Sequence, residues 1–532
     1  MDSRRADFVI VGGGSAGCVL AARLSEEPGV EVVVVEAGGP GESDDIRIPG
    51  LARNLFLSDY DWAFFSEPEP MLEGRRVYQP RGRVLGGSSA INMMVYMRGS
   101  AADYDEWAAL GNVGWDYASV LPYFKKAEDN ERGESRFHGS GGPLAVSDSR
   151  SRNPLAAAFV EAAVEYGLPA NDDFNAERQV GAGFFQVTQR EGERCSAAAA
   201  YLHPIIGRPN LTVLTDARAV RVVVEHGRAT GVEVATDDGG RVVTAGREVI
   251  LAAGAFNSPQ LLLLSGIGPA DELRRHGIPI TLELPGVGAN LHDHQGVLTS
   301  WETHEAIGLW NVISEVNRER FDRERRGPMT TNYVEVGAFA RIAGSTEAEI
   351  EFHVMPGITY VDKRRRAQQP GLSIFPTLLK PRARGRVGLQ SRDALAPPRI
   401  ELGYYSDPAD LDTMLEGVGM AAELARQPAL ARHIARGHEA PAALDRDTLL
   451  EHVVAQTQTI YHAAGTCAMG AVVDAELRVR GVDGLRVVDA SVMPTPVRGN
   501  TNAPVIMIAE RAADLIVGRQ PLAAAERSPV EA

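Results

Sequence analysis

A glycine-rich turn between a short apolar strand and a helical segment is the feature that most constrains the fold of this chain. Residues 7–17 read DFVIVGGGSAG, so an apolar run breaks into glycines and then into a helical pattern over 15–26. A second apolar run over 30–35 ends on Glu36, close to the spacing at which an acidic side chain meets the ribose hydroxyls of adenosine. The pattern predicts a strand, turn, helix and strand that bind a dinucleotide.

The glycines of this turn have separate mechanical roles. They provide a tight turn, close approach of the backbone to a pyrophosphate, and close packing of the helix, whose N-terminus would hold the phosphates. A glycine-rich turn without a ligand is the alternative, and the surrounding strand–helix–strand pattern argues against it. We expect the following residues to contact the nucleotide: Gly12, Gly14, Ser15, Ala16, Gly17, Glu36 and Ala37.

Length and charge exclude several classes of function. A chain of 532 residues is too long for one hydrophobic core, so we expect at least two domains. The formal net charge of −16 argues against nucleic acid or an anionic membrane as a partner, because such binding needs a basic face. The one basic run, residues 363–366, is interpreted as a solvated loop.

Cysteine usage and the N-terminal sequence indicate a reducing compartment. Cys18, Cys195 and Cys467 are far apart and odd in number, which favours neither a disulfide framework nor a zinc site. The N-terminus enters a strand with no apolar leader before it, and no apolar run approaches the length of a membrane span. We expect a cytoplasmic protein with no integral membrane segment.

Strands typical of the nucleotide domain recur far along the chain, so that domain is predicted to be discontinuous. Strand patterns occur over 219–224, 231–235, 248–254 and 485–491, and helical patterns over 258–264 and 504–518. The expected nucleotide domain comprises 1–145, 191–299 and 461–520. Residues 146–190 and 300–460 have a different pattern, with polar turns, short alternating strands and helical patches, and are expected to form a substrate domain. The end of the chain, 521–532, is expected to be a loose tail.

Four long motifs occur in a fixed order. They are GRVLGGSSAIN at 82–92, GAFNSPQLLLLSGIG at 254–268, YHAAGTCAMG at 461–470 and GNTNAP at 499–504. The chain resembles the glucose-methanol-choline (GMC) oxidoreductases through these motifs. The resemblance implies an α/β fold, with a Rossmann-like FAD-binding domain and a substrate domain whose mainly antiparallel sheet is flanked by helices. It also implies an FAD-dependent enzyme that acts on alcohols.

A nucleotide domain that begins at the N-terminus and closes with the last strand suits a cofactor that never leaves, which favours FAD over a diffusible nicotinamide. Backbone N–H groups around Gly87 and Ser88 could cradle a phosphate or the flavin, with a plain loop as the alternative. The resemblance places Asn92, Met93, Met94 and Val95 against the isoalloxazine ring, and Val220, Asp489 and Ala490 against the adenosine or ribityl portions. Some choline-oxidising relatives link the flavin covalently to a histidine where Ile91 stands, so we expect non-covalent FAD.

Oxidation of an alcohol needs a base for the hydroxyl proton and an acceptor for the hydride, which is flavin N5. His462 is aligned with the family base, and the unperturbed pKa of histidine, about 6.5, suits that role. The alternative is a hydrogen-bonded structural histidine. Asn500 matches the second active-site position and could donate a hydrogen bond to the developing alkoxide, or merely shape a turn. The helix opened by Asn502, Ala503 and Pro504 would favour negative charge on the reduced flavin through its dipole.

Other chemistries are disfavoured by particular residues. The segment His292–His294 could suggest a metal site, but neighbours on extended backbone point to opposite faces and no third ligand is nearby, so a structural loop is expected. No serine hydrolase site is evident. Photodecarboxylases of the family have a cysteine where Leu379 stands and no histidine where His462 stands. Hydroxynitrile lyases of the family usually have a second histidine where Asn500 lies.

The predicted function is therefore FAD-dependent oxidation of an alcohol, expected to be primary, to the aldehyde. Two alternatives stay open: a hydroxynitrile-lyase-like enzyme that keeps FAD structurally, and a non-catalytic flavin-binding protein. His462 argues against the last. The partners expected are a small-molecule alcohol and an electron acceptor, either oxygen or a quinone. The sequence does not identify the alcohol, because the pocket lies in the divergent substrate domain.

Overall fold

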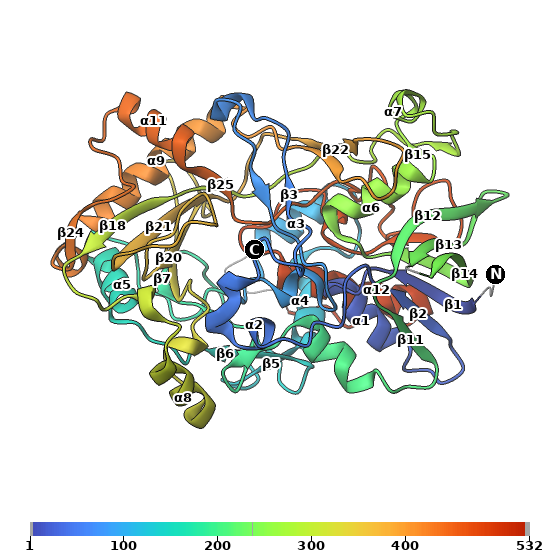
Figure 1. Ribbon diagram of the computed structural model, residues 1–532, viewed down its shortest axis with the longest axis horizontal. Coiled ribbons are helices and arrows are strands. Elements are labelled where there is room, and N and C mark those ends of the chain that lie inside the picture. Colours follow the sequence, from blue (N-terminus) through green and yellow to red (C-terminus); the bar gives the residue numbers. More distant parts are fainter. Residues whose placement is uncertain (1–3, 237, 527–532) are drawn as a thin grey trace.

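Two sheets at opposite ends of the molecule organise the computed structural model, which describes residues 4–236 and 238–526 (Figure 1). The first sheet has seven strands, with the order β11-β2-β1-β14-β13-β12 and β26 also paired to β14. Its bounds are β1 (Arg4–Val11), β2 (Val32–Val35), β11 (Leu211–Leu214), β12 (Arg218–Glu225), β13 (Arg228–Thr236), β14 (Gly239–Leu251) and β26 (Leu485–Val487). The discontinuity expected from the sequence is confirmed, because β14 pairs in parallel with both β1 and β26.

Strand β2 and the C-terminal ends of β1 and β14 are apolar runs buried on both faces, as a sheet covered by helices requires. Helices α1 (Ser15–Leu24) and α12 (Asn502–Val517) pack against each other beside it. Arg23 of α1 forms an ion pair of 2.7 Å with the buried Glu510 of α12. The last helix is therefore tied to the first βα unit, which closes the domain around residues from both ends of the chain.

The second sheet has eight strands and is antiparallel, as expected. The order is β24-β18-β21-β20-β19-β7, with β17 pairing to β21 and β25. The bounds are β7 (Gly181–Phe184), β17 (Gln295–Val297), β18 (Thr299–Thr303), β19 (Val336–Ala340), β20 (Ile350–Met355), β21 (Gly371–Leu378), β24 (Ile434–Gly437) and β25 (Thr457–Thr459). Strand β17 belongs to this sheet through its pairing with β21 and β25. The sheet therefore includes residues before 300, where the sequence pattern placed the start of the second segment of the substrate domain.

Helices α5 (Pro154–Tyr166) and α9 (Pro408–Ala425) pack on the second sheet and on each other. Asp407 caps α9 through its side chain, in agreement with the helix expected there. The remaining helices are α2 (Asp44–Arg47), α3 (Ala101–Ala109), α4 (Tyr117–Ala127), α6 (Gly254–Leu264), α7 (Ala270–Arg275), α8 (Glu315–Glu324), α10 (Pro428–Ala431) and α11 (Arg446–Gln456). The remaining strands are β3 (Phe64–Phe65), β4 (Tyr78–Gln79), β5 (Glu128–Asn130), β6 (Leu144–Asp148), β8 (Gln186–Val187), β9 (Gln189–Arg190), β10 (Glu193–Arg194), β15 (Ile267–Gly268), β16 (Leu282–Glu283), β22 (Arg386–Leu389) and β23 (Pro398–Glu401).

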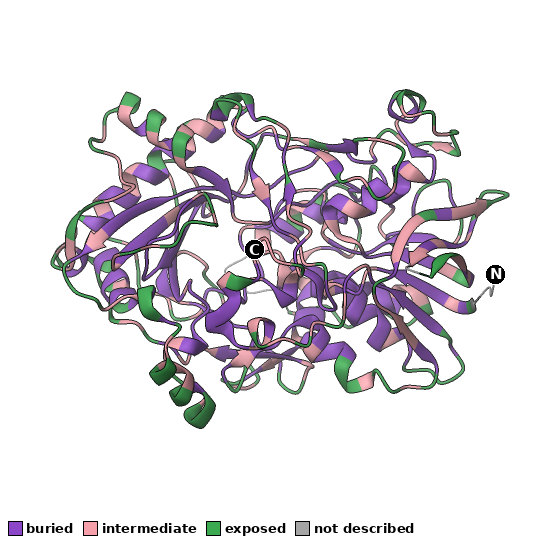
Figure 2. Ribbon diagram, viewed as in Figure 1, coloured by how far each residue is buried: buried purple, intermediate pink, exposed green. Residues whose placement is uncertain are grey.

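Burial follows the two sheets, while α8 projects into solvent with mostly exposed residues (Figure 2). Among the described residues, no helix is long and apolar enough to cross a membrane. The tail has no regular structure over 519–526 but is attached to the body, since the Leu522 N–H donates to Tyr123 and the Ala525 N–H donates to the Ala118 carbonyl. The expected loose tail extends to 532, and its part from 527 lies outside the described residues.

Candidate active site

A cavity of about 350 Å³ is lined by residues of both sheets and of the loops between them. Most of the residues predicted from the sequence line it: Gly12, Gly14, Ser15, Ala16, Glu36, Ala37, Gly87, Ser88, Asn92, Met93, Met94, Val95, His462, Asp489, Ala490, Asn500 and Asn502. The structure thus brings together residues nearly five hundred positions apart in the sequence. The nucleotide motif and the C-terminal motifs share one cavity.

Four predicted cofactor contacts do not line this cavity: Gly17, Val220, Ala503 and Pro504. Gly17 has a packing role instead, because a Cβ there would lie 1.9 Å from the Gly12 carbonyl oxygen. On β12 the lining residues are Arg218 and Ala219, just before Val220. Ala503 and Pro504 are buried inside the first turn of α12, so only Asn502 and Val505 of that turn reach the cavity.

The nucleotide end of the cavity offers an N-terminus for an anion. Gly14 caps α1 without a side-chain hydrogen bond, and Ser15 at the start of the helix donates to Asn502 Oδ1 at 2.9 Å. Exposed N–H groups at such a helix start favour a phosphate. Glu36 lies at the end of β2, where its carboxylate accepts the N–H groups of Gly13 and Gly38 at 2.8 Å each. Burial raises the pKa of Glu36 to about 7.

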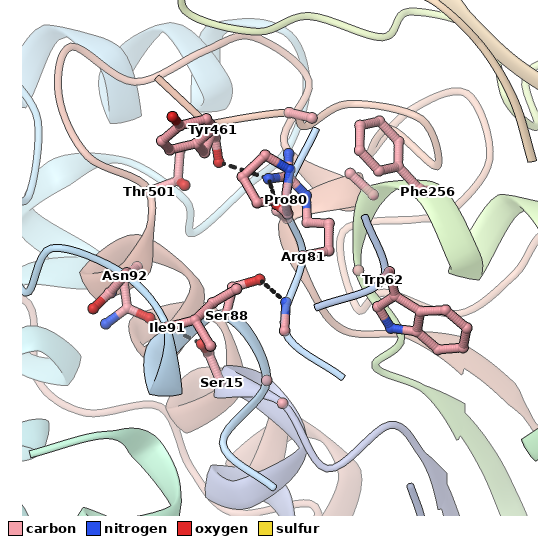
Figure 3. Close-up of a pocket in the computed structure, with 18 of the residues that line it drawn as sticks. Ser15, Trp62, Pro80, Arg81, Ser88, Ile91, Asn92, Phe256, Tyr461 and Thr501 are labelled. Atoms are coloured by element: carbon pink, nitrogen blue, oxygen red, sulfur yellow. Dashed lines mark hydrogen bonds between the residues drawn. The ribbon is translucent and has the colours of Figure 1, made fainter. Parts of the chain in front are cut away.

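The loops that carry Ser15 and Ser88 cross closely where they line the cavity (Figure 3). Gly87 has a φ of +52°, and a Cβ on it would lie 2.7 Å from Gly14 Cα, so no side chain fits between the loops. Ser88 accepts the Gly82 N–H at 3.2 Å, and Arg81 donates to the Tyr461 carbonyl oxygen at 3.1 Å. Gly14 and Gly87 both line the cavity, so backbone as well as side chains bounds it at this point.

These features fit FAD as the occupant. The glycine crossing and the open start of α1 form a cradle that a Cβ would fill. Several buried polar atoms that line the cavity have no hydrogen-bond partner among the described residues: Arg81 Nη2, His353 Nδ1 and Asn500 Oδ1. Unpaired buried polar groups are costly unless a ligand satisfies them. The residues present could therefore hold a flavin dinucleotide.

His462 is held from the backbone side. Its N–H donates to Asp293 Oδ1 at 2.9 Å, and Asp293 Oδ2 also accepts the hydroxyl groups of Thr459 and Tyr404 at 2.6 Å each. The preceding residue, Tyr461, has a φ of +76°, a left-handed conformation that is rare for a tyrosine. This backbone turn and the buried carboxylate fix the position from which the imidazole enters the cavity.

The hydrogen-bond network assigns the proton of His462. His294 Nε2 lies 2.9 Å from the Leu379 carbonyl oxygen, which can only accept, so this nitrogen carries the proton. In neutral His294, Nδ1 is then the acceptor, and it lies 2.9 Å from His462 Nδ1. His462 therefore donates from Nδ1, and its Nε2 keeps a lone pair on the side of Asn500.

Asn500 lies between two histidines. Its Nδ2 is 3.2 Å from His462 Nε2 and 3.4 Å from His353 Nε2. His353 projects from β20, two residues after Glu351, whose Oε1 lies 3.2 Å from His353 Nε2 at an angle that makes no hydrogen bond. Burial raises the pKa of Glu351 well above its usual value, so this carboxyl group is neutral. Asn500, Glu351 and the imidazoles of His294, His353 and His462 form a polar corner with no net negative charge.

All three histidines of this corner are held in the neutral form. Burial is the largest cause in each case, and it lowers the pKa of His462 well below its usual value. It lowers the pKa values of His294 and His353 to about 4. The neighbouring positive charge of Arg81 further disfavours protonation of His462. The imidazole can accept a proton at Nε2 over the whole neutral range.

Two interpretations from the sequence are corrected here. The segment His292–His294 is more than a structural loop, because His294 contacts His462 directly. Lys363 is not solvated with the rest of the run 363–366: it lines the cavity, and its Nζ donates to Gln458 Oε1 at 2.7 Å, while Arg364, Arg365 and Arg366 are exposed as expected. Both side chains come from segments distant in sequence, so only the tertiary structure brings them to the cavity.

Sequence reasoning also missed His353 and Asp293. A signal existed for His353: the alternation of β20 places it on the same face as the polar Glu351, which is unusual for a strand in which every residue is buried. Asp293 had no such signal, because its partners Thr459 and Tyr404 lie more than a hundred residues further along the chain. The three free cysteines are buried, and among the described residues no group of three or more potential ligands could hold a metal ion.

Comparisons with known proteins agree with this arrangement. A family model described as GMC oxidoreductase matches residues 6–296 in its N-terminal part and 381–509 in its C-terminal part. An alcohol dehydrogenase [acceptor] of Pseudomonas putida is 40% identical over 553 residues, covering 98% of this chain and 97% of the relative. An oxygen-dependent choline dehydrogenase of Sinorhizobium medicae is 42% identical, covering 99% of this chain and 98% of the relative.

Solved structures of the same shape include two oxidases. Pyridoxine 4-oxidase from Mesorbium loti superposes with a TM-score of 0.90 at 31% identity, covering 97% of this chain and 100% of that chain. A formate oxidase of Aspergillus oryzae, solved to study the effect of a mutation on FAD modification, superposes with a TM-score of 0.92 at 28% identity, covering 97% of this chain and 99% of that chain. The likeness therefore extends over both sheets.

Proposed function

Because the chain belongs to the GMC oxidoreductase family and is an FAD-dependent oxidoreductase that acts on CH–OH donors, we propose that it oxidises a primary alcohol to the aldehyde with His462 as the base. Bound FAD would supply the hydride acceptor at flavin N5. The remaining chemistry falls to this chain: it must orient the alcohol, remove the hydroxyl proton and stabilise the alkoxide.

One observation carries the proposal: the lone pair at His462 Nε2. Hydrogen bonds run from His462 to His294 and from His294 to the Leu379 carbonyl oxygen. They leave His462 Nε2 as the acceptor facing Asn500. A hydroxyl group placed beside it would donate to Nε2 and pass its proton there. The imidazolium formed would keep its Nδ1–H bond to His294, so no second proton transfer is needed.

Asn500 is proposed to hold the substrate oxygen. Its Nδ2 group lies between His462 and His353, where a hydroxyl oxygen would find a donor as negative charge develops. An amide does not titrate, so it cannot replace His462 as the base. Asn92, Met93, Met94 and Val95 would contact the flavin ring, and Glu36 and Asp489 the nucleotide portion. The expected domain division assigns cofactor binding to 1–145, 191–299 and 461–520, and substrate binding to 146–190 and 300–460.

The FAD is proposed to be bound non-covalently. Ile91 lines the cavity in the loop before Asn92, and an aliphatic side chain offers no nucleophile for a flavin linkage. Whether oxygen or a quinone reoxidises the flavin is a separate question, which the anaerobic experiment described next answers. No charge or metal is needed for proton removal, because burial already keeps His462 neutral.

The decisive experiment is an anaerobic panel of alcohols mixed with the FAD-loaded enzyme while the flavin absorbance is followed. We expect bleaching by primary alcohols, followed by recovery on admission of air if oxygen is the acceptor, or only on addition of a quinone if it is not. Cleavage of a cyanohydrin without bleaching would identify a lyase instead. Absence of both reactions over a broad panel would indicate a non-catalytic flavoprotein.

A further inference from the structure

One wall of the cavity carries a cationic patch, formed by Arg53, Lys363 and Arg366. All three side chains line the same cavity as His462. This is unexpected in a chain with a formal net charge of −16. Positive charge gathered in one cleft of an acidic protein attracts anions to that cleft.

Contacts with neighbouring groups position Arg53 and Lys363 of the patch. Arg53 belongs to a single helical turn, Pro49–Asn54, and its guanidinium lies 5.9 Å from the centre of the Tyr333 ring. The Tyr333 hydroxyl donates to the Gly50 carbonyl oxygen at 2.6 Å, which ties the ring to that turn. Lys363 Nζ donates to the Tyr360 carbonyl oxygen at 2.9 Å and to Gln458 Oε1 at 2.7 Å.

These cations have no counter-ion. Lys363 bonds only neutral oxygens, and Arg366 donates only to backbone carbonyl groups, one of them that of Arg53 at 3.4 Å. Within the described part of the chain, no carboxylate lies within ion-pair distance of any of the three; exposed Asp362, next to Lys363, is the one acid that acts on the patch electrostatically.

The charges also act on one another. Burial, and then the positive charge of Arg53, lowers the pKa of Lys363 to about 7. Burial, and then the charge of Arg366, lowers the pKa of Arg53. Like charges held together at a half-buried site without a partner are unfavourable, and such an arrangement is typical of a ligand site. An anion among them would relieve both the repulsion and the lost solvation.

The carboxylates that line the cavity do not neutralise the cationic patch. Among the described residues that line it, the only acids are Glu36 and Asp489. Glu36 follows β2 and is bonded to the N–H groups of Gly13 and Gly38, while Asp489 follows β26 and accepts the Gly254 N–H at 2.9 Å and the Ser258 hydroxyl at 2.6 Å. Both belong to the nucleotide end. Glu351, beside His353, does not line the cavity and its buried carboxyl group is neutral, so among the described residues a cationic substrate would find no ionised acid beside Asn500.

We propose that Arg53, Lys363 and Arg366 form an oxyanion-binding subsite, and that the alcohol oxidised here carries a carboxylate or a phosphate at a distance from its reacting hydroxyl. This rests on the proposed alcohol oxidation. The planar guanidinium of Arg53 can take two oxygens of such a group and Lys363 can add a point charge. Phe56, Met355 and Phe375 line the cavity as well and offer apolar contacts to the carbon skeleton. A quaternary ammonium alcohol, the substrate class named for some relatives, is disfavoured by the same charges.

The substrate test compares alcohols of one length and different charge on the FAD-loaded enzyme: ω-hydroxyhexanoate, its methyl ester, ω-aminohexanol and the monophosphate of hexanediol. We expect kcat/KM for an anionic alcohol to exceed that for the ester by at least about tenfold, mainly through KM, and the amine to be poorest. The carboxylate and phosphate arms identify which oxyanion is preferred. If the ester or the amine matches or exceeds both anions, the subsite is excluded while alcohol oxidation stands.

Variants separate the subsite from general damage. Arg53→Gln and Lys363→Gln should each weaken kcat/KM for the anionic alcohol by about tenfold or more and lower that for the ester by a clearly smaller factor, whereas Arg53→Lys should recover part of the loss. Lys363→Glu should shift the preference toward ω-aminohexanol, a gain that misfolding cannot imitate. Arg365→Gln is the matched control, since Arg365 is exposed and does not line the cavity. Equal losses for ester and anion would overturn the assignment.

A binding measurement decides the question even without turnover. Hexanoate has no hydroxyl to oxidise, and we expect it to perturb the absorbance of the bound flavin saturably at constant ionic strength, whereas hexanamide does not. Arg53→Gln should abolish the perturbation. If no alcohol bleaches the flavin but hexanoate binds in this way, the proposed oxidation fails and the subsite stands. Equal responses to hexanoate and hexanamide would exclude it.

Discussion

The Nδ1 atoms of His294 and His462 lie 2.9 Å apart, with the two rings nearly perpendicular at 84°. One of these nitrogens must donate and the other accept. Because His294 uses its Nε2 proton on the Leu379 carbonyl oxygen, the donor is His462. A residue that never needs to touch the substrate thereby sets the tautomer of the residue proposed to take its proton.

His294→Ala should therefore change the pH dependence of flavin reduction. The variant lets water into the corner and removes the electrostatic effect of His294, the two largest causes of the depressed pKa of His462, so this pKa should move back toward the ordinary value of about 6.5. A base works only when unprotonated, so a raised pKa moves the acid limb of the rate profile to higher pH. Wild type should stay flat through neutrality, while the variant loses rate on going from about pH 8 to about pH 6.

The measurement is anaerobic stopped-flow reduction across this pH range, with FAD content checked by absorbance. His452→Ala is the matched control, because His452 Nε2 also bonds a backbone carbonyl, that of Leu298 at 3.0 Å, yet does not line the cavity. A His294 variant with an unshifted pH profile would reduce that residue to a structural role.

His462→Ala should retain FAD and slow flavin reduction by about a hundredfold or more, the usual contribution of a positioned base. FAD retention is expected because the nucleotide end of the cavity depends on Gly14, Ser15 and Glu36 rather than on this histidine. Rates are compared by stopped-flow mixing with saturating alcohol. An unchanged rate would remove His462 from the mechanism.

Acid precipitation should release yellow FAD into the supernatant, because Ile91 provides no nucleophile for a flavin linkage. The measurement is the flavin absorbance of supernatant and pellet after denaturation. Ile91→His offers an informative contrast, since it would place a potential nucleophile at that loop position. Flavin retained in the wild-type pellet would show that another side chain forms the bond.

The fold could be predicted largely from local patterns. The strand, turn and helix of residues 4–24 follow from an apolar run and three glycines, and α9 from the cap at Asp407. Such elements depend on neighbours in sequence, so their signals are local. The sequence boundary of the second sheet, set at residue 300, was placed less well. Strand β17 is short, and it becomes part of the sheet only by pairing with β25, about 160 positions later.

The site was predictable where a motif carries it and not where the partners are distant. His462 and Asn500 stand in long motifs, and both line the cavity. Lys363 stands in a run that resembles any solvated loop, and only its bond to Gln458 distinguishes it from its neighbours. His294 likewise depends on a contact across 168 positions. No pattern along the chain specifies such pairs, since each is fixed by the packing of two separate elements.

Asn500→Ala should lower the rate of flavin reduction by less than His462→Ala does. The variant loses one donor to the developing negative charge, worth up to about 3 kcal/mol, which corresponds to a loss of tens of fold to roughly a hundredfold in rate, while the base remains. Its pH profile should still show a single basic group, because Asn500 does not titrate and lies 3.2 Å from His462 without bearing charge. Asn502→Ala is the matched comparison, since Asn502 lines the same cavity but bonds Ser15 at the start of α1. If Asn500→Ala left reduction untouched while Asn502→Ala abolished it, the proposed roles of these two amides would have to be exchanged.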